Sequence, residues 1–170
     1  DVERSRGLGD VYKRQEVGKM MEKNLPKFKK FTDQGYLIIA PIPSCVLMYK
    51  QELPLLFPDN QDLLKVSKSF RDPFEFLNML NDEGILKTDF NTELGNISYQ
   101  VACHQRVQNF GMLTKKILEL VPGTTVNAIE RCSGHDGTYG VKLETHDIAI
   151  KIARPITKSF KDANFDSFTS

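Results

Sequence analysis

The N-terminal part of the chain changes from a helical apolar pattern to a continuous apolar run. Apolar residues recur at helical spacing over residues 16–31 and predict a helix there, which Pro26 is placed to interrupt. The apolar positions of this helix are Val17, Met20, Met21, Leu25 and Phe28. Gly35 marks its end, and the apolar run YLIIA at residues 36–40 is typical of a buried parallel strand.

The rest of the chain alternates predicted helices and strands. The pattern predicts helices over residues 46–57, 60–70, 73–80, 106–120 and 141–153, and strands over residues 95–102 and 124–129. Residues 106–120 form the strongest helical pattern. After Pro155 the sequence is aperiodic and predicts neither a helix nor a strand. Because strands and helices alternate, we expect an α/β fold with a parallel sheet flanked by helices.

Each of the three cysteines follows a predicted strand. Cys45, Cys103 and Cys132 lie within a few residues of strand carboxyl ends, so a strand–cysteine–helix unit recurs along the chain. The carboxyl ends of parallel strands line the crevice where ligands bind, and a following helix N-terminus favours a thiolate. Thiolates gathered there are ligands for zinc or for iron–sulfur clusters. The alternative is inert burial, which is common for free cysteine.

The glycine-rich loop of residues 132–140 suits the wall of such a site. Gly134 and Gly137 let the backbone approach a ligand closely, although their spacing matches neither a dinucleotide-binding nor a Walker loop. His104 directly follows a cysteine and His135 lies in the loop, so either can ligate a metal or donate a hydrogen bond to a cluster sulfur. A tight turn with solvated or capping histidines is the alternative.

Composition narrows the classes of function. Hydrophobic residues make up 40% of the 170-residue chain and charged residues 26%, which is enough for a packed core. Lys and Arg number 23 and Asp and Glu number 22, so we expect no nucleic-acid binding through bulk charge. We expect neither a membrane span nor a signal peptide, because no apolar run has the required length or position. Three cysteines do not indicate a disulfide scaffold, which favours a reducing, cytoplasmic location.

Residues 1–15 differ from the rest of the chain. They contain two close glycines, Gly7 and Gly9, and no amphipathic period, and the stretch SRGLGDVYKRQ resembles translated adapter sequence. A flexible native tail is the alternative interpretation. Both interpretations predict a disordered tail that takes no part in the fold.

Several stretches together resemble a known family. They are ACHQRVQN at residues 102–109, LVPG at residues 120–123 and ERCSGHDGTYG at residues 130–140. These stretches are similar to the cysteine-rich (CCG) domain of iron–sulfur oxidoreductases, a family that includes the cysteine-rich subunit of heterodisulfide reductase and the iron–sulfur subunit of glycolate oxidase. The branch of the iron–sulfur subunit of anaerobic glycerol-3-phosphate dehydrogenase is the most similar, through PSCVLM at residues 43–48, KQELP at residues 50–54 and DPFE at residues 72–75.

The resemblance implies an iron–sulfur electron-transfer subunit of a cytoplasmic oxidoreductase rather than a stand-alone catalyst. It implies a [4Fe-4S] cluster bound by Cys45, Cys103 and Cys132, and electron relay between a flavin- or ferredoxin-bearing partner subunit and a quinone or disulfide acceptor. Peripheral contact with the inner face of a membrane is compatible with this role. Ser133 occupies the second position of the family's adjacent cysteine pair and Ile42 replaces another cysteine, so the implied ligand set is incomplete.

The resemblance also assigns the domains. Residues 16–95 correspond to the end of a first cysteine-rich repeat with a helical connection, and residues 96–170 to a second repeat whose last cysteine would lie beyond Ser170. We therefore expect a fragment of a longer protein. Two alternatives stay open: a degenerate, non-redox module that docks partner subunits, and a zinc-binding domain in which the histidines complete the ligands.

Overall fold

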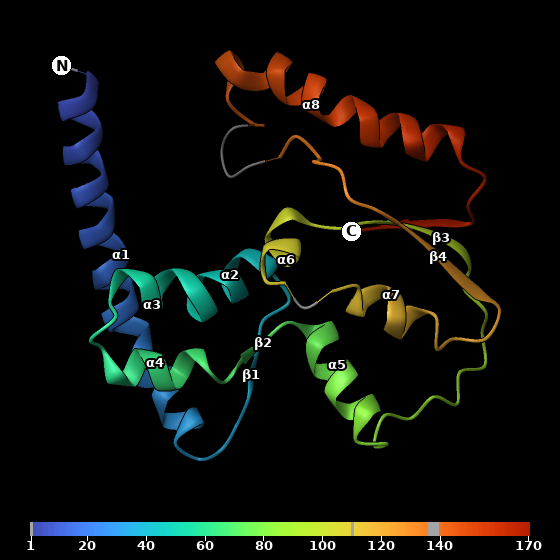
Figure 1. Cartoon of the computed structure of the whole chain (residues 1–170), viewed down its shortest axis with the longest axis horizontal. Coiled ribbons are helices and arrows are strands. Elements are labelled where there is room, and N and C mark those ends of the chain that lie inside the picture. Colours follow the sequence, from blue (N-terminus) through green and yellow to red (C-terminus); the bar gives the residue numbers. More distant parts are fainter. Residues whose placement is uncertain (1, 110, 136–139) are drawn as a thin grey trace. The chain divides into compact units, whose positions relative to one another are not determined.

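The computed structural model describes residues 2–109, 111–135 and 140–170 (Figure 1). The chain divides into two compact units, unit 1 (residues 1–72) and unit 2 (residues 73–170). Both contain helices and a small parallel sheet, which confirms the predicted α/β class, although the strands form two sheets rather than one.

Within the described ranges, no helix is both long enough and apolar enough to cross a bilayer. The boundary expected between two cysteine-rich repeats at residue 95 stays a prediction.

Unit 1 is mostly helical and contains one short sheet. Its elements are α1 (Val2–Thr32), β1 (Ile38–Ile39), α2 (Pro43–Leu47), the π-helical turn η1 (Met48–Glu52), α3 (Leu53–Leu56), α4 (Gln61–Ser67) and β2 (Phe70–Arg71). β1 and β2 pair in parallel, with Ile38 opposite Phe70. α1 runs through Pro26 without a break, and residues 2–15 are helical where we expected a disordered tail. Extending an established helix requires no new nucleus, so a weak sequence pattern suffices.

Apolar side chains from α1, α3, α4 and β2 form the core of unit 1. The buried members are Met21, Leu25, Leu53, Leu63, Val66 and Phe70. Tyr49 stacks on Phe70 with the ring centroids 4.4 Å apart, and Phe28 contacts both rings edge-on. Asn60 caps α4 by accepting a hydrogen bond from the Leu63 amide at 3.0 Å. The core and this cap together set the position of α4 against α1.

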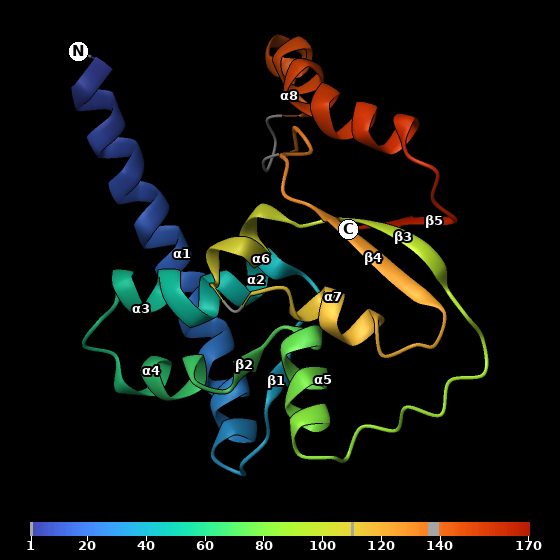
Figure 2. The same cartoon turned by 45° about the vertical axis from the view of Figure 1, so that its right-hand side comes forward.

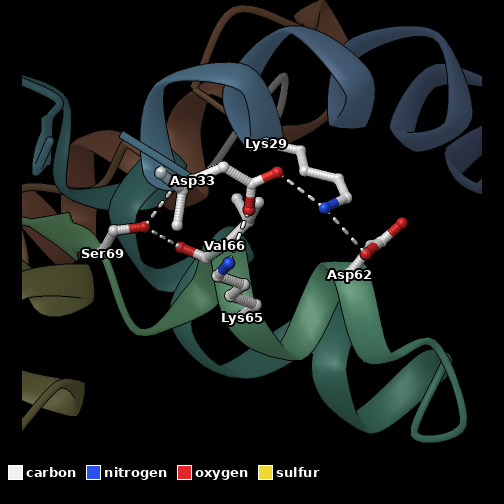
Figure 3. Close-up of polar contacts among 7 residues, drawn as sticks. Lys29, Asp33, Asp62, Lys65, Val66 and Ser69 are labelled. Carbon is white, nitrogen blue, oxygen red and sulfur yellow. Dashed lines mark hydrogen bonds and ion pairs between the residues drawn. The ribbon is translucent and has the colours of Figure 1, made fainter. Parts of the chain in front are cut away.

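Charged side chains connect α1 and the residue after it to α4 (Figure 3). Asp33 pairs with Lys29 at 2.8 Å and with Lys65 at 2.5 Å, and Lys29 also pairs with Asp62 at 3.4 Å. Hydrogen bonds from Lys29 and Lys65 hold the pKa of the Asp33 carboxyl below its ordinary value, because they favour the charged form. The side chains of these pairs are partly exposed to solvent, so each pair contributes little stability.

Unit 2 is built on a three-stranded parallel sheet. Its elements are α5 (Pro73–Asp82), β3 (Gly95–Gln100), α6 (Cys103–Val107), α7 (Leu113–Leu118), β4 (Thr124–Ile129), α8 (Leu143–Asp162) and β5 (Ser167–Thr169). The strand order is β4-β3-β5, so β3 is central. The buried core residues of the sheet are Ile97, Tyr99, Val101 and Val126. α7 packs against β4 and α5 packs against α7, while α8 lies across the sheet from both (Figure 2).

Two sequence predictions for unit 2 are wrong. The helix expected over residues 106–120 is divided into α6 and α7, because Asn109 and Gly111 adopt left-handed backbone conformations (φ 57° and 76°) that interrupt a helix. The chain after Pro155 does form secondary structure: α8 continues to Asp162, and β5 pairs with β3. Ile156, immediately after the proline, is buried.

Candidate functional site

Two of the three cysteines meet at the carboxyl edge of the unit 2 sheet. β3 and β4 are parallel, and their last paired residues are Gln100 and Ile129. Cys103 and Cys132 each lie three residues beyond this pair, so the register brings both to the same end of the sheet. The Val101 amide donates a hydrogen bond to the Ile129 carbonyl at 3.0 Å, which extends the pairing toward the cysteines.

Gln100 connects the two segments that lead to the cysteines. Its side-chain amide donates to the carbonyl of Val101 at 2.9 Å and to the carbonyl of Arg131 at 2.8 Å. Gln100 is buried, and a buried amide with both bonds made restricts the spacing of the two segments. Because Arg131 is adjacent to Cys132, this bond positions the second cysteine directly.

The thiols of Cys103 and Cys132 lie close enough to act on each other's charge. Partial burial and the neighbouring Cys132 thiol raise the pKa of the Cys103 thiol, and the Arg106 guanidinium opposes them with a smaller effect. The net effect of its surroundings on Cys103 is thus to disfavour the thiolate, chiefly through burial. All three cysteines are exposed and unbridged, so inert burial is also excluded for them.

Gly134 holds the loop after β4 against α8. Its backbone amide donates to the Cys132 sulfur at 3.4 Å. Its φ is 76°, and a side chain at this position would collide with the Ala149 carbonyl of α8. The close backbone approach predicted for this glycine is therefore made to a helix of the same unit.

A buried polar network fixes α6, which contains Cys103, to β3 and α7. The Tyr99 hydroxyl donates to Oε1 of Gln105, and Nε2 of Gln105 donates to Oγ1 of Thr114 at 2.9 Å. All three residues are buried, where unpaired polar groups are costly, so the network defines the position of α6. No sequence pattern predicted this role, because a polar residue in a predicted element carries no sign of its partner.

The other residues predicted for the site are Arg106, His104, His135 and Gly137. Arg106 pairs with Glu130 at 3.4 Å. His104 and His135 are exposed, and the backbone carbonyl of His104 accepts a hydrogen bond from the Gln108 side chain at 3.1 Å. Gly137 lies outside the described residues. In the part of the chain that the structure describes, no group of three or more His, Cys, Asp or Glu side chains is arranged to hold a metal ion.

Cys45 belongs to unit 1, where it lies in α2. It is close to Tyr49, whose hydroxyl pKa is raised chiefly by burial. The contact between Cys103 and Cys132 is made within unit 2. The predicted gathering of all three cysteines therefore stays a prediction.

Unit 2 also contains an apolar pocket of about 520 Å³, which no sequence pattern predicted. Its walls come from α5, α7 and the segment that precedes β3, and they include Phe74, Leu77, Phe90, Ile117 and Val121. Its size suits a small apolar molecule. None of the described cysteines or histidines lines it, so it is separate from the thiol pair.

No known protein family and no solved structure matches this sequence. The resemblance to the cysteine-rich oxidoreductase domain consequently stays a proposal that depends on the residues quoted for it. The geometry of unit 2 is independent of that resemblance.

Proposed function

We propose that this chain is part of an iron–sulfur electron-transfer subunit of an oxidoreductase, with Cys103 and Cys132 as two cluster ligands. The observation that carries the proposal is that the strand register brings both cysteines to the carboxyl edge of a parallel sheet, where their thiols act on each other's charge. Paired thiolates suit a soft metal centre such as zinc or an iron–sulfur cluster. The resemblance favours iron–sulfur and adds flavin- or ferredoxin-bearing subunits as partners.

The ligand count limits what unit 2 can hold by itself. A [4Fe-4S] cluster takes four thiolates, and the described residues of unit 2 supply two, so a four-iron cluster does not fit this unit alone. Under the proposal, the remaining thiolates come from outside unit 2. Unit 2 orients its two cysteines. The Gly134 amide donates to the Cys132 sulfur, and the Gln105 network holds α6, which contains Cys103, in place.

Anaerobic reconstitution of the full chain with iron and sulfide tests the proposal. Ser133→Cys restores the second cysteine of the family's adjacent pair at an exposed position beside Cys132. We expect this variant to bind more iron and acid-labile sulfide than the parent chain and to give an EPR signal after reduction. Ser170→Cys adds a cysteine at another exposed position and is the matched control.

The gain in Ser133→Cys should be lost when Cys103 or Cys132 is also replaced by Ser. Equal iron content in Ser133→Cys and Ser170→Cys would contradict the proposal, as would zinc or no metal in every sample. Zinc alone would support the zinc-binding alternative.

A subunit-docking module without redox chemistry is the second candidate. It is favoured by exposed apolar side chains on α8, where Leu143 is 92% exposed and Ile148 is 47% exposed. Exposed apolar side chains grouped on one element are typical of protein interfaces. Under this candidate, replacing both Cys103 and Cys132 by Ser leaves the activity of the complex that contains the chain unchanged.

A further inference from the structure

We infer that Cys103 and Cys132 form a reversible intramolecular disulfide by exchange with a low-molecular-mass disulfide. The inference concerns the metal-free chain and does not rest on the proposed cluster. The two residues each lie three positions beyond the last β3–β4 pair, their thiols act on each other's charge, and both residues are exposed to solvent. They are thus close to one another and open to a small reagent.

The sheet supports closure of this bond. The paired strands β3 and β4 end side by side at Gln100 and Ile129, and both cysteines follow this end within three residues. A disulfide requires Cα atoms about 4.4–6.8 Å apart. Cys103 and Cys132 stand at equal distances along the chain from the last β3–β4 pair, and Gln100 bridges the two segments through the Arg131 carbonyl at 2.8 Å. Both cysteines belong to unit 2, so the geometry does not involve Cys45.

The surroundings of the pair suit an exchange reaction. Arg106 lies close enough to the Cys103 thiol to act on its charge and partly opposes the raised pKa of this thiol, while it also pairs with Glu130 at 3.4 Å. The Gly134 amide donates to the Cys132 sulfur, an interaction that also stabilises this sulfur when it carries negative charge. Cys132 is therefore the sulfur with a direct hydrogen-bond donor, and it suits the leaving or attacking role in the exchange.

The reaction proceeds in two displacements. One protein thiolate attacks the small disulfide, forms a mixed disulfide and releases one small thiolate, which takes up a proton. The second protein thiolate then attacks the protein sulfur of the mixed disulfide, and the other small thiol leaves with a proton. The two cysteines together lose two electrons and two protons, and the small disulfide gains them to become two thiols. An excess of small thiol reverses both displacements.

The disulfide would also exclude metal, because neither sulfur is then a thiolate ligand. This consequence does rest on the proposed function: reconstitution with iron would succeed only with the reduced pair. Disulfide formation itself is measured without metal, so its failure is distinguishable from failure of the cluster proposal.

Peptide mapping of the metal-free chain tests the inference. The reduced chain is incubated with oxidised glutathione under anaerobic conditions, alkylated with N-ethylmaleimide and digested with trypsin. Trypsin places the three cysteines in separate peptides, residues 31–50, 88–106 and 132–142. We expect peptides 88–106 and 132–142 to be joined with loss of two hydrogen atoms, and peptide 31–50 to stay alkylated. Dithiothreitol should separate the joined peptides.

Variants at exposed positions separate the possible outcomes. Cys45→Ser should form the same bond to the same extent, whereas Cys132→Ser should hold a persistent glutathione adduct on Cys103. Circular dichroism of each variant confirms that it is folded. Glutathione adducts that persist on both Cys103 and Cys132 of the parent chain would overturn the inference. A bond to Cys45 or to a second molecule would also overturn it.

Discussion

Gly134 connects the cysteine loop to a helix that lies later in the chain. Its backbone takes a left-handed conformation with φ of 76°, and the Ala149 carbonyl occupies the space where a side chain would project. Gly84 in the same unit has a similar φ of 70° but no atom within 4 Å of that space. The two glycines therefore separate the effect of backbone conformation from the effect of close packing.

Gly134→Ala should destabilise unit 2 more than Gly84→Ala does. Left-handed backbone costs an alanine about 1–2 kcal/mol in either variant, and overpacking against α8 adds about 1–3 kcal/mol at Gly134 alone. Urea unfolding followed by circular dichroism measures both changes in the free energy of unfolding. Equal losses in the two variants would show that the loop does not depend on its contact with α8.

At the scale of elements, two residues with left-handed backbone conformations decide where α6 ends and where α7 can begin. The end of α6 and the whole of α7 cover about half of the helix predicted over residues 106–120, and the left-handed residues Asn109 and Gly111 separate them. This break matters for the candidate site, because it lets α6 pack independently through Gln105. Asn and Gly are the residues that most readily adopt this conformation, so the break has a sequence signal that apolar periodicity outweighed.

The ion pairs between Asp33 and two lysines predict a pH dependence of unit 1. The pKa of Asp33 is lowered from its ordinary value of 3.8 by folding. The stabilisation is thus complete at pH values above 3.8 and is lost as the pH falls through the lower pKa of the folded state. Asp33→Asn should therefore be less stable than the parent chain at neutral pH, and the difference should disappear in strong acid.

Urea unfolding at a series of pH values measures this difference, with Asp59→Asn as a variant at another exposed carboxylate of unit 1. Added salt should shrink the effect of Asp33→Asn, because the ion pairs are exposed to solvent. A constant difference between Asp33→Asn and the parent chain at every pH would mean that the loss does not come from the carboxylate charge.

At the scale of the whole molecule, the two units have separate cores. The buried clusters consist of residues from unit 1 alone or from unit 2 alone. The segment between Cys103 and Cys132 lies within unit 2. A covalent bond between these cysteines therefore constrains the unfolded state of one unit only.

Oxidation of the pair should stabilise unit 2 selectively. Closing a loop over residues 103–132 removes unfolded-state entropy worth roughly 3–4 kcal/mol. Hydrogen exchange measured by mass spectrometry should show slower exchange in β3 and β4 of the oxidised chain and unchanged exchange in α1 and α4. Slower exchange throughout both units would indicate that they unfold together, and no slowing in β3 or β4 would indicate a strained bond.

The sequence by itself determined the fold class and the places of the main strands. The predicted strands at residues 95–102 and 124–129 correspond to β3 and β4, because local apolar runs between turn residues report burial directly. The cysteines also follow strands as predicted. These features depend on neighbours along the chain, which a pattern can report.

The tertiary structure alone decided which side chains meet. Parallel register brings Cys103 to Cys132, and the buried bonds of Gln100 and Gln105 hold their segments in place. Long-range packing also placed β5 beside β3, in a region where the sequence is aperiodic. Such contacts join residues far apart in the chain, and their free energy depends on burial and geometry that exist only after folding.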